Sequence, residues 1–108
     1  MTAQHDKTVS AICVTDKRAV DLEKFNLWFA NVLAQNEGDI FRTKAILRVT
    51  GPDSDHLHVL QGVHATYQVT KGRAWRGDES RRSRIVFIGR YLDPVDMKDS
   101  LAAHCFTE

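Results

Sequence analysis

The spacing of hydrophobic positions changes from one segment of the chain to the next. Residues 8–15 form a short uninterrupted run rich in β-branched side chains, which predicts a first strand. Beyond Asp21, a suitable N-cap residue, apolar side chains recur at helical spacing until Gly38, which is well placed to end a helix. The apolar face of this predicted helix consists of Leu22, Phe25, Trp28, Phe29, Val32 and Leu33.

From Phe41 the period of the pattern is two, as in a strand with one polar face. The apolar set is Phe41, Ala45, Leu47 and Val49, and the basic set on the other side is Arg42, Lys44 and Arg48. A turn cluster at residues 51–55 precedes a second alternating run, residues 56–69. We expect the two runs to pair as a hairpin.

Residues 83–90 predict a strand that is buried on both faces. Ile85 and Phe87 point one way, whereas Val86 and Ile88 point the other. Such a strand belongs in the middle of a sheet or beneath a partner. After the strand, Asp93 and Pro94 supply an N-cap and a first helical residue for a closing helix.

The order of the predicted elements is β-α-β-β-β-α. Consecutive strands flanked by helices favour an α+β fold, a two-layer sandwich in which helices cover one face of a mostly antiparallel four-stranded sheet. With 108 residues, the chain has the length of one domain spanning residues 1–108. We expect residues 1–7 to form a disordered lead-in.

Composition and charge exclude several classes of protein. The hydrophobic fraction of 43% and the net charge of +1 are those of an ordinary globular chain. No apolar run approaches the length of a membrane helix, and the opening residues lack a secretory signal. Cys13 and Cys105 lie far apart and are expected to be buried, reduced thiols. We therefore expect an intracellular, cytoplasmic protein with no membrane partner.

The sequence contains none of the common catalytic motifs. The patterns GxxxxGK(S/T), HExxH, GxSxG and GxGxxG are all absent. The isolated acids Asp39, Asp53 and Glu79 lie in predicted caps and loops, and nothing pairs them as acid and base. We expect no catalytic residues in this chain.

Three of the five histidines fall within the segment HLHVLQGVH, residues 56–64. By alternation His56, His58 and His64 share the polar face, opposite the apolar odd positions. His64 lies too far along an extended strand to join the other two on one ion. A zinc or cobalt site using His56 and His58 is therefore one alternative, and it needs ligands from elsewhere.

Basic residues gather in the segment from Lys71 to Arg90. Seven basic residues against two acidic ones leave a local charge of +5, which suits nucleic acid. However, a sheet that binds single strands needs exposed aromatic side chains, and alternation assigns Phe41, Tyr67 and Phe87 to the core. Nucleic acid is therefore the weaker alternative.

Four segments resemble the C-terminal domain of the CobW family of GTP-dependent metallochaperones. They are residues 21–47, with an FRxK strand at Phe41, Arg42 and Lys44; QGVH at residues 61–64; the loop residue Trp75; and RSRIVFIGRYLD at residues 82–93. The chain departs from the family pattern at Ala45, where glycine is common, and at Arg18, Ala19 and Val20, where the family has Arg-Pro-Phe.

The resemblance implies an accessory role rather than catalysis. Intact family members couple GTP hydrolysis to zinc or cobalt delivery through a GTPase domain with a phosphate loop and a CxCC motif, and neither motif occurs in these residues. GTP would thus act only through such a separate domain. We expect a non-catalytic domain that docks on a GTPase domain, a client metalloprotein or another copy of itself.

The polar sheet face is the hypothesised docking surface. Val86 and Ile88 are expected on this same face, where apolar side chains call for cover. The residues of the hypothesised surface are Arg42, Lys44, His56, His58, His64 and Arg84.

Overall fold

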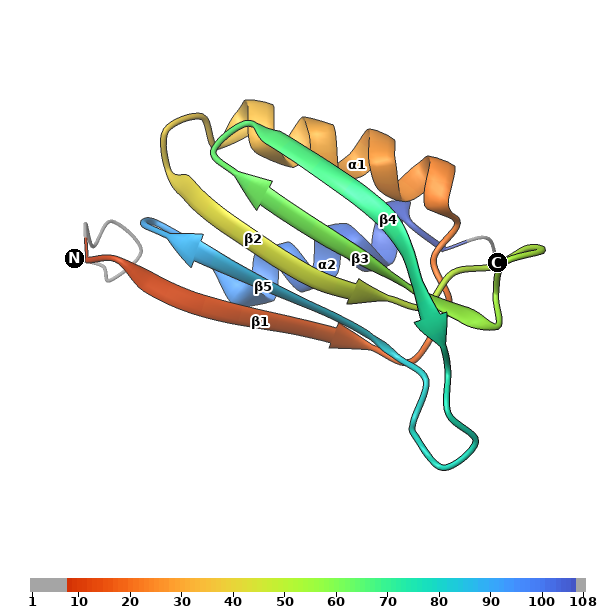
Figure 1. Ribbon diagram of the computed structural model, residues 1–108. Helices are drawn as coiled ribbons and strands as arrows, with labels where there is room; N and C mark the ends of the chain where they lie inside the picture. Colours follow the sequence, from red (N-terminus) through yellow and green to blue (C-terminus); the bar gives the residue numbers. More distant parts are fainter. Residues whose placement is uncertain (1–7, 107–108) are drawn as a thin grey trace.

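One antiparallel sheet with two helices behind it makes up the part of the chain that the computed structural model describes, residues 8–106 (Figure 1). The disordered lead-in expected at residues 1–7 lies outside these residues. The elements are β1 (Ser10–Asp16), α1 (Leu22–Gln35), β2 (Ile40–Leu47), β3 (His56–Val63), β4 (Thr66–Ala74), β5 (Ser83–Gly89) and α2 (Pro94–His104).

The strands lie side by side in the order β1-β5-β2-β3-β4, and every neighbouring pair is antiparallel. Because β5 separates β1 from β2, those two strands run in the same direction and α1 connects them. Both helices cover the same face of the sheet (Figure 1). The predicted α+β class, the β2–β3 hairpin and the interior position of β5 are confirmed.

The sheet contains five strands where the sequence predicted four. The run expected as one strand over residues 56–69 is divided between β3 and β4, and β4 continues to Ala74. His64 lies in the turn between them with a left-handed φ of 53°. Its amide donates to the carbonyl oxygen of Phe41 at 2.9 Å, so the turn is tied to β2.

The core lies between the sheet and the helices, with aromatic rings of α1 at its centre. Phe29 packs edge-on against Tyr67 of β4, with centroids 4.7 Å apart, and contacts Phe87 of β5 at 6.1 Å. Phe25, Phe29 and Phe87 are fully buried. Burying each such side chain stabilises the fold by roughly 1.5–3 kcal/mol, so the rings bind α1 to both halves of the sheet.

Both helices begin where the sequence predicted. The Asp21 carboxylate accepts from the Lys24 amide at 3.0 Å, and the Asp93 carboxylate accepts from the amides of Val95 and Asp96. Each cap satisfies amides that have no partner within the helix. The caps fix the residue at which each helix begins.

The backbone at the end of β5 lies against the backbone at the start of β2 at Gly89. A Cβ atom on Gly89 would overlap the carbonyl oxygen of Asp39 and lie 3.0 Å from its carbonyl carbon. The neighbouring Arg90 amide donates to the same oxygen at 2.9 Å, which holds the two backbones together. Only glycine fits between them.

We expect Gly89→Ala to lower the free energy of unfolding by about 3 kcal/mol, the upper end of overpacking costs, because backbone atoms must move apart. Urea unfolding followed by circular dichroism measures this change. Gly77→Ala is the matched control, since no atom lies within 4 Å of its added Cβ, and its effect should stay within about 0.5 kcal/mol. Equal effects of the two substitutions would contradict the close approach.

Candidate functional site

The face of the sheet turned away from the helices, here called the open face, is the candidate site (Figure 1). The alternate side chains, such as Ala45, Leu60 and Phe87, belong to the core. Strand register arranges the open face in three rows across the sheet. The rows are Ala11, Ile88, Arg42, Val63 and Thr66; Cys13, Val86, Lys44, Gln61 and Gln68; and Thr15, Arg84, Ile46, Val59 and Thr70.

Three cations stand on the open face without acidic neighbours. Arg42, Lys44 and Arg84 are exposed. Among the described residues no ion pair includes any of them. None of the fifteen positions in the three rows is acidic. Their positive potential is therefore directed at whatever lies over the sheet.

Aliphatic side chains surround these cations. Ile46 is 41% exposed, Val63 is 52% exposed and Ile88 is 38% exposed. Val59 and Val86 between them are half-buried. Ile46 has the same parity as Arg42 and Lys44, so the period of two could have placed it on this surface. A face that combines exposed aliphatic groups with unpaired cations is typical of a protein-binding surface.

The two halves of the open face differ in polarity. A hollow of about 380 Å³ lies over β2, β3 and β4, with Gln61 and Gln68 beside Arg42 and Lys44 in its lining. The β1 and β5 half carries small or aliphatic side chains over two of its rows, namely Ala11, Cys13, Val86 and Ile88. The cations of β2 therefore stand at the boundary between an apolar and a polar half. Cys13 is exposed, so its predicted burial is wrong, whereas Cys105 is buried as predicted.

The structure does not bring the three histidines to the open face. His58 lies opposite the core residue Leu47 and is only 5% exposed, so its predicted position on the polar face is wrong. From His58 onward the even positions of β3, His58, Leu60 and Gly62, face the helices, and the odd positions Val59 and Val63 face outward. His56 is half-buried beyond the three rows, and His64 lies in the β3–β4 turn.

The histidine pair has no further ligands for a metal. His58 Nδ1 lies 3.2 Å from the carbonyl oxygen of His56, an acceptor, so this nitrogen donates when it carries a proton. Within residues 8–106 no three His, Cys, Asp or Glu side chains are grouped to hold an ion. The zinc or cobalt alternative stays a prediction without a third ligand.

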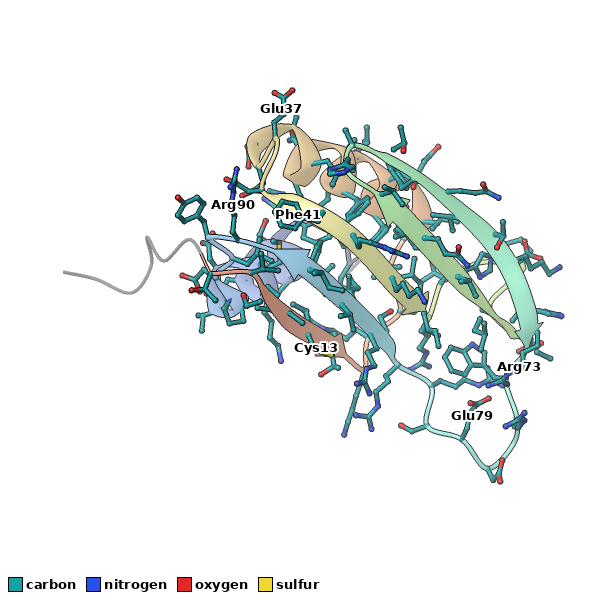
Figure 2. The ribbon with its side chains drawn as sticks, turned by 60° about the vertical axis from the view of Figure 1, so that its left-hand side comes forward. Cys13, Glu37, Phe41, Arg73, Glu79 and Arg90 are labelled. Carbon is teal, nitrogen blue, oxygen red and sulfur yellow. The ribbon has the colours of Figure 1, made fainter. Side chains whose placement is uncertain are left out.

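Phe41 does not join the core as alternation predicted. It lies in a register shift between Ile40 and Arg42, where it is half-buried. Figure 2 shows the Arg90 side chain beside its ring, with Cζ 5.9 Å from the centroid, and Arg90 Nε donates to Asp39 at 2.9 Å. The ring of His64 faces it edge-on at 6.3 Å.

Four of the seven basic residues in the segment 71–90 form ion pairs with carboxylates. Their carboxylate partners lie in the turn between β2 and β3, in the β4–β5 loop and directly before β2. The pairs are Lys71–Asp53, Arg73–Glu79, Arg81–Asp55 and Arg90–Asp39. The structure therefore adds no support for the nucleic-acid alternative.

Glu79 organises the β4–β5 loop (Figure 2). It accepts two hydrogen bonds from the Arg73 guanidinium, at 2.7 and 3.0 Å, and one from the Arg76 amide at 2.7 Å. These bonds, first the Arg73 side chain and then the Arg76 amide, lower the pKa of Glu79 to about 2. Trp75 in the same loop is buried, and its amide donates to the Asp55 carbonyl at 2.9 Å.

The fold is that of an α+β domain in which the helices leave one face of the sheet open. Residues 9–105 match the family described as the cobalamin synthesis protein cobW C-terminal domain. The chain belongs to this family, and the resemblance of its four segments is confirmed.

The relatives are larger proteins. The zinc chaperone YjiA of Escherichia coli strain K12 is 29% identical over 100 residues, which are 93% of this chain and 30% of the relative. Crystal structures of zinc-bound YjiA GTPase, from E. coli and as a triple mutant, superpose with TM-scores of 0.79 at 28% identity, covering 88% of this chain and 29% of theirs. The chain thus spans about 30% of their length. None of the helices within residues 8–106 has the length and apolarity to cross a membrane.

Replacing the loop carboxylate by an amide, Glu79→Gln, should free the β4–β5 loop while leaving the sheet intact. We expect faster amide exchange at residues 75–80 and faster tryptic cleavage after Arg76. Asp78→Asn, which removes a neighbouring exposed charge, is the control. Because the pKa of Glu79 is depressed from 4.5 to about 2, the loop contacts should be complete above about pH 4.5 and be lost as the pH falls toward 2. Unchanged exchange in Glu79→Gln would contradict this role.

Proposed function

We propose that this chain is a non-catalytic accessory domain of a CobW-like, GTP-dependent metal chaperone. Its open face docks on the GTPase domain of such a protein, and zinc or cobalt is the cargo of the whole assembly rather than a ligand of this domain. The observation that carries the proposal is a sheet face without covering helices, on which three unpaired cations stand among exposed aliphatic side chains.

The distribution of charge supports docking. Cations in and beside the β4–β5 loop, such as Arg73 at the end of β4 and Arg81, have carboxylate partners, whereas Arg42 and Lys44 have none among the described residues. Exposed ion pairs contribute little to folding, so leaving Arg42 and Lys44 unpaired costs the domain little. Their charge is free to steer and orient a partner.

The relatives support a GTPase domain as the partner. YjiA is described both as a zinc chaperone and as a GTPase, and this chain matches about 30% of it. A domain that accompanies a GTPase needs a contact surface with the GTPase domain, so that a change in the bound nucleotide can affect it. The open face is the largest surface of the sheet that the helices leave uncovered. A client metalloprotein or a second copy would occupy the same surface in competition with the GTPase domain.

Charge reversal tests the proposal. The double substitution Arg42→Glu with Lys44→Glu should weaken binding to the CobW-family GTPase domain of the same genome at least about tenfold, because two favourable contacts become repulsive. Titration calorimetry with the separately produced GTPase domain measures the affinity. Circular dichroism and urea unfolding verify that the variant keeps its fold.

The matched control is Lys24→Glu with Lys98→Glu, which makes the same change of charge on exposed residues of the two helices. We expect this control to bind as the unsubstituted chain does. Equal binding by both double variants would reject the open face as the docking surface.

A further inference from the structure

We propose that the partner element bound by the open face is an acidic amphipathic α-helix, whose carboxylates, one helical turn apart, contact Arg42 and Lys44. This inference rests on the proposed docking function and adds the chemistry and shape of the partner. It follows from the pattern of charge, the neighbouring aliphatic stripe and the spacing of the two cations.

The charge pattern selects an acidic partner. A surface that covers Arg42, Lys44 and Arg84 removes water from three cations that have no carboxylate partner in the part of the chain that the structure describes. An apolar partner would leave these charges uncompensated, and a basic partner would repel them. Carboxylates on the partner restore the lost interactions and fix its orientation.

An aliphatic stripe runs beside the cations. On β5, Ile88 lies directly opposite Arg42, and Val86 lies directly opposite Lys44. Neighbouring strands are about 4.8 Å apart, so the two stripes are parallel and adjacent. A partner that satisfies both must carry an apolar stripe next to an acidic one, which is the surface of an amphipathic element.

The spacing matches a helix aligned with β2. Two residues along a strand separate Arg42 from Lys44 by about 7 Å. Carboxylates at positions i and i+4 of a helix are about 6 Å apart along its axis. Apolar residues at i+3 and i+7 of that helix form the adjacent stripe, over Ile88 and Val86. Arg84 lies diagonally from Lys44, about 7–8 Å away, within reach of a third carboxylate.

Backbone chemistry also favours a helix. An extended segment lying flat on a sheet face would leave its amides and carbonyls without partners, whereas a helix satisfies its own. The opposite face of this sheet is already covered in that way by α1 and α2 (Figure 1). A partner helix would complete a three-layer arrangement.

Single-stranded nucleic acid fits this face less well. None of the fifteen positions in the three rows is aromatic, so bases would find no rings on which to stack. Aliphatic side chains border the cations instead, and these match leucine-type side chains of a helix.

The probe for this inference is a synthetic helical peptide, stapled on its outer side, with Glu at i and i+4 and Leu at i+3 and i+7. Two further peptides serve as controls: one with Lys in place of Glu, and one of identical composition with the Glu residues moved away from the Leu stripe. NMR amide shifts and affinities are recorded for the full chain, and a single-stranded RNA oligomer is titrated in parallel.

We expect the acidic peptide to shift amides of β2 and β5 and to bind at least about tenfold more tightly than either control peptide. The Arg42→Glu, Lys44→Glu variant should lose this binding and gain affinity for the Lys peptide, whereas Lys24→Glu, Lys98→Glu should behave like the unsubstituted chain. This exchange of preference would show direct contact between the stripes.

Equal binding of the Glu and Lys peptides, shifts confined to α1 and α2, or tighter binding of RNA at the same amides would overturn the inference. The result is separable from the GTPase test. If the GTPase domain binds the open face and the acidic peptide does not, the helix is wrong and docking stands. If only the peptide binds, the acidic helix stands and its source is another protein.

Discussion

The position of β5 between β1 and β2 is the constraint on which the rest of the structure depends. This last strand joins the N-terminal strand to the β2–β3–β4 meander, and without it the sheet separates into two parts. Its side chains alternate between the two faces, so Ile85 and Phe87 pack against the helices while Val86 and Ile88 face outward. Ile88 is 38% exposed, so the prediction of a strand buried on both faces is wrong. The strand that joins β1 to the rest of the sheet therefore also places an aliphatic stripe on the open face.

A single extra residue in β2 decides which side chains of this strand face outward beside that stripe. Ile40 is buried in the core, and regular alternation from it would also turn Arg42 and Lys44 toward the helices. The register shift at Phe41 reverses the parity, so Thr43 and Ala45 are buried and the two cations face outward. The close approach at Gly89 holds the strands together at this point. The site thus depends on a local irregularity that the backbone of β5 stabilises.

The same irregularities mark the limit of what the sequence could reveal. Helix caps, the interior strand and the hairpin follow from local signals, because Asp21, Asp93 and the apolar residues of β5 carry them within a few positions. The faces of β3 do not follow from local signals. Leu57 and Val59 alternate with His58 and Leu60, and either set could face the helices. Only pairing with Leu47 places His58 in the core. The turn at His64 was hidden because alternation continues through it.

Some cations of the described residues have carboxylate partners and others have none, and this contrast is the strongest indication of function. With 15 basic and 14 acidic residues, there are enough carboxylates to pair nearly every cation. Yet three of the acids, Glu79, Asp53 and Asp55, lie in turns and loops, where they pair with cations around β4. Within residues 8–106, Arg42, Lys44 and Arg84 are paired with none of them. The paired charges in the loops organise the fold. The cations on the sheet face, which carries no acids in its three rows, are available to a partner.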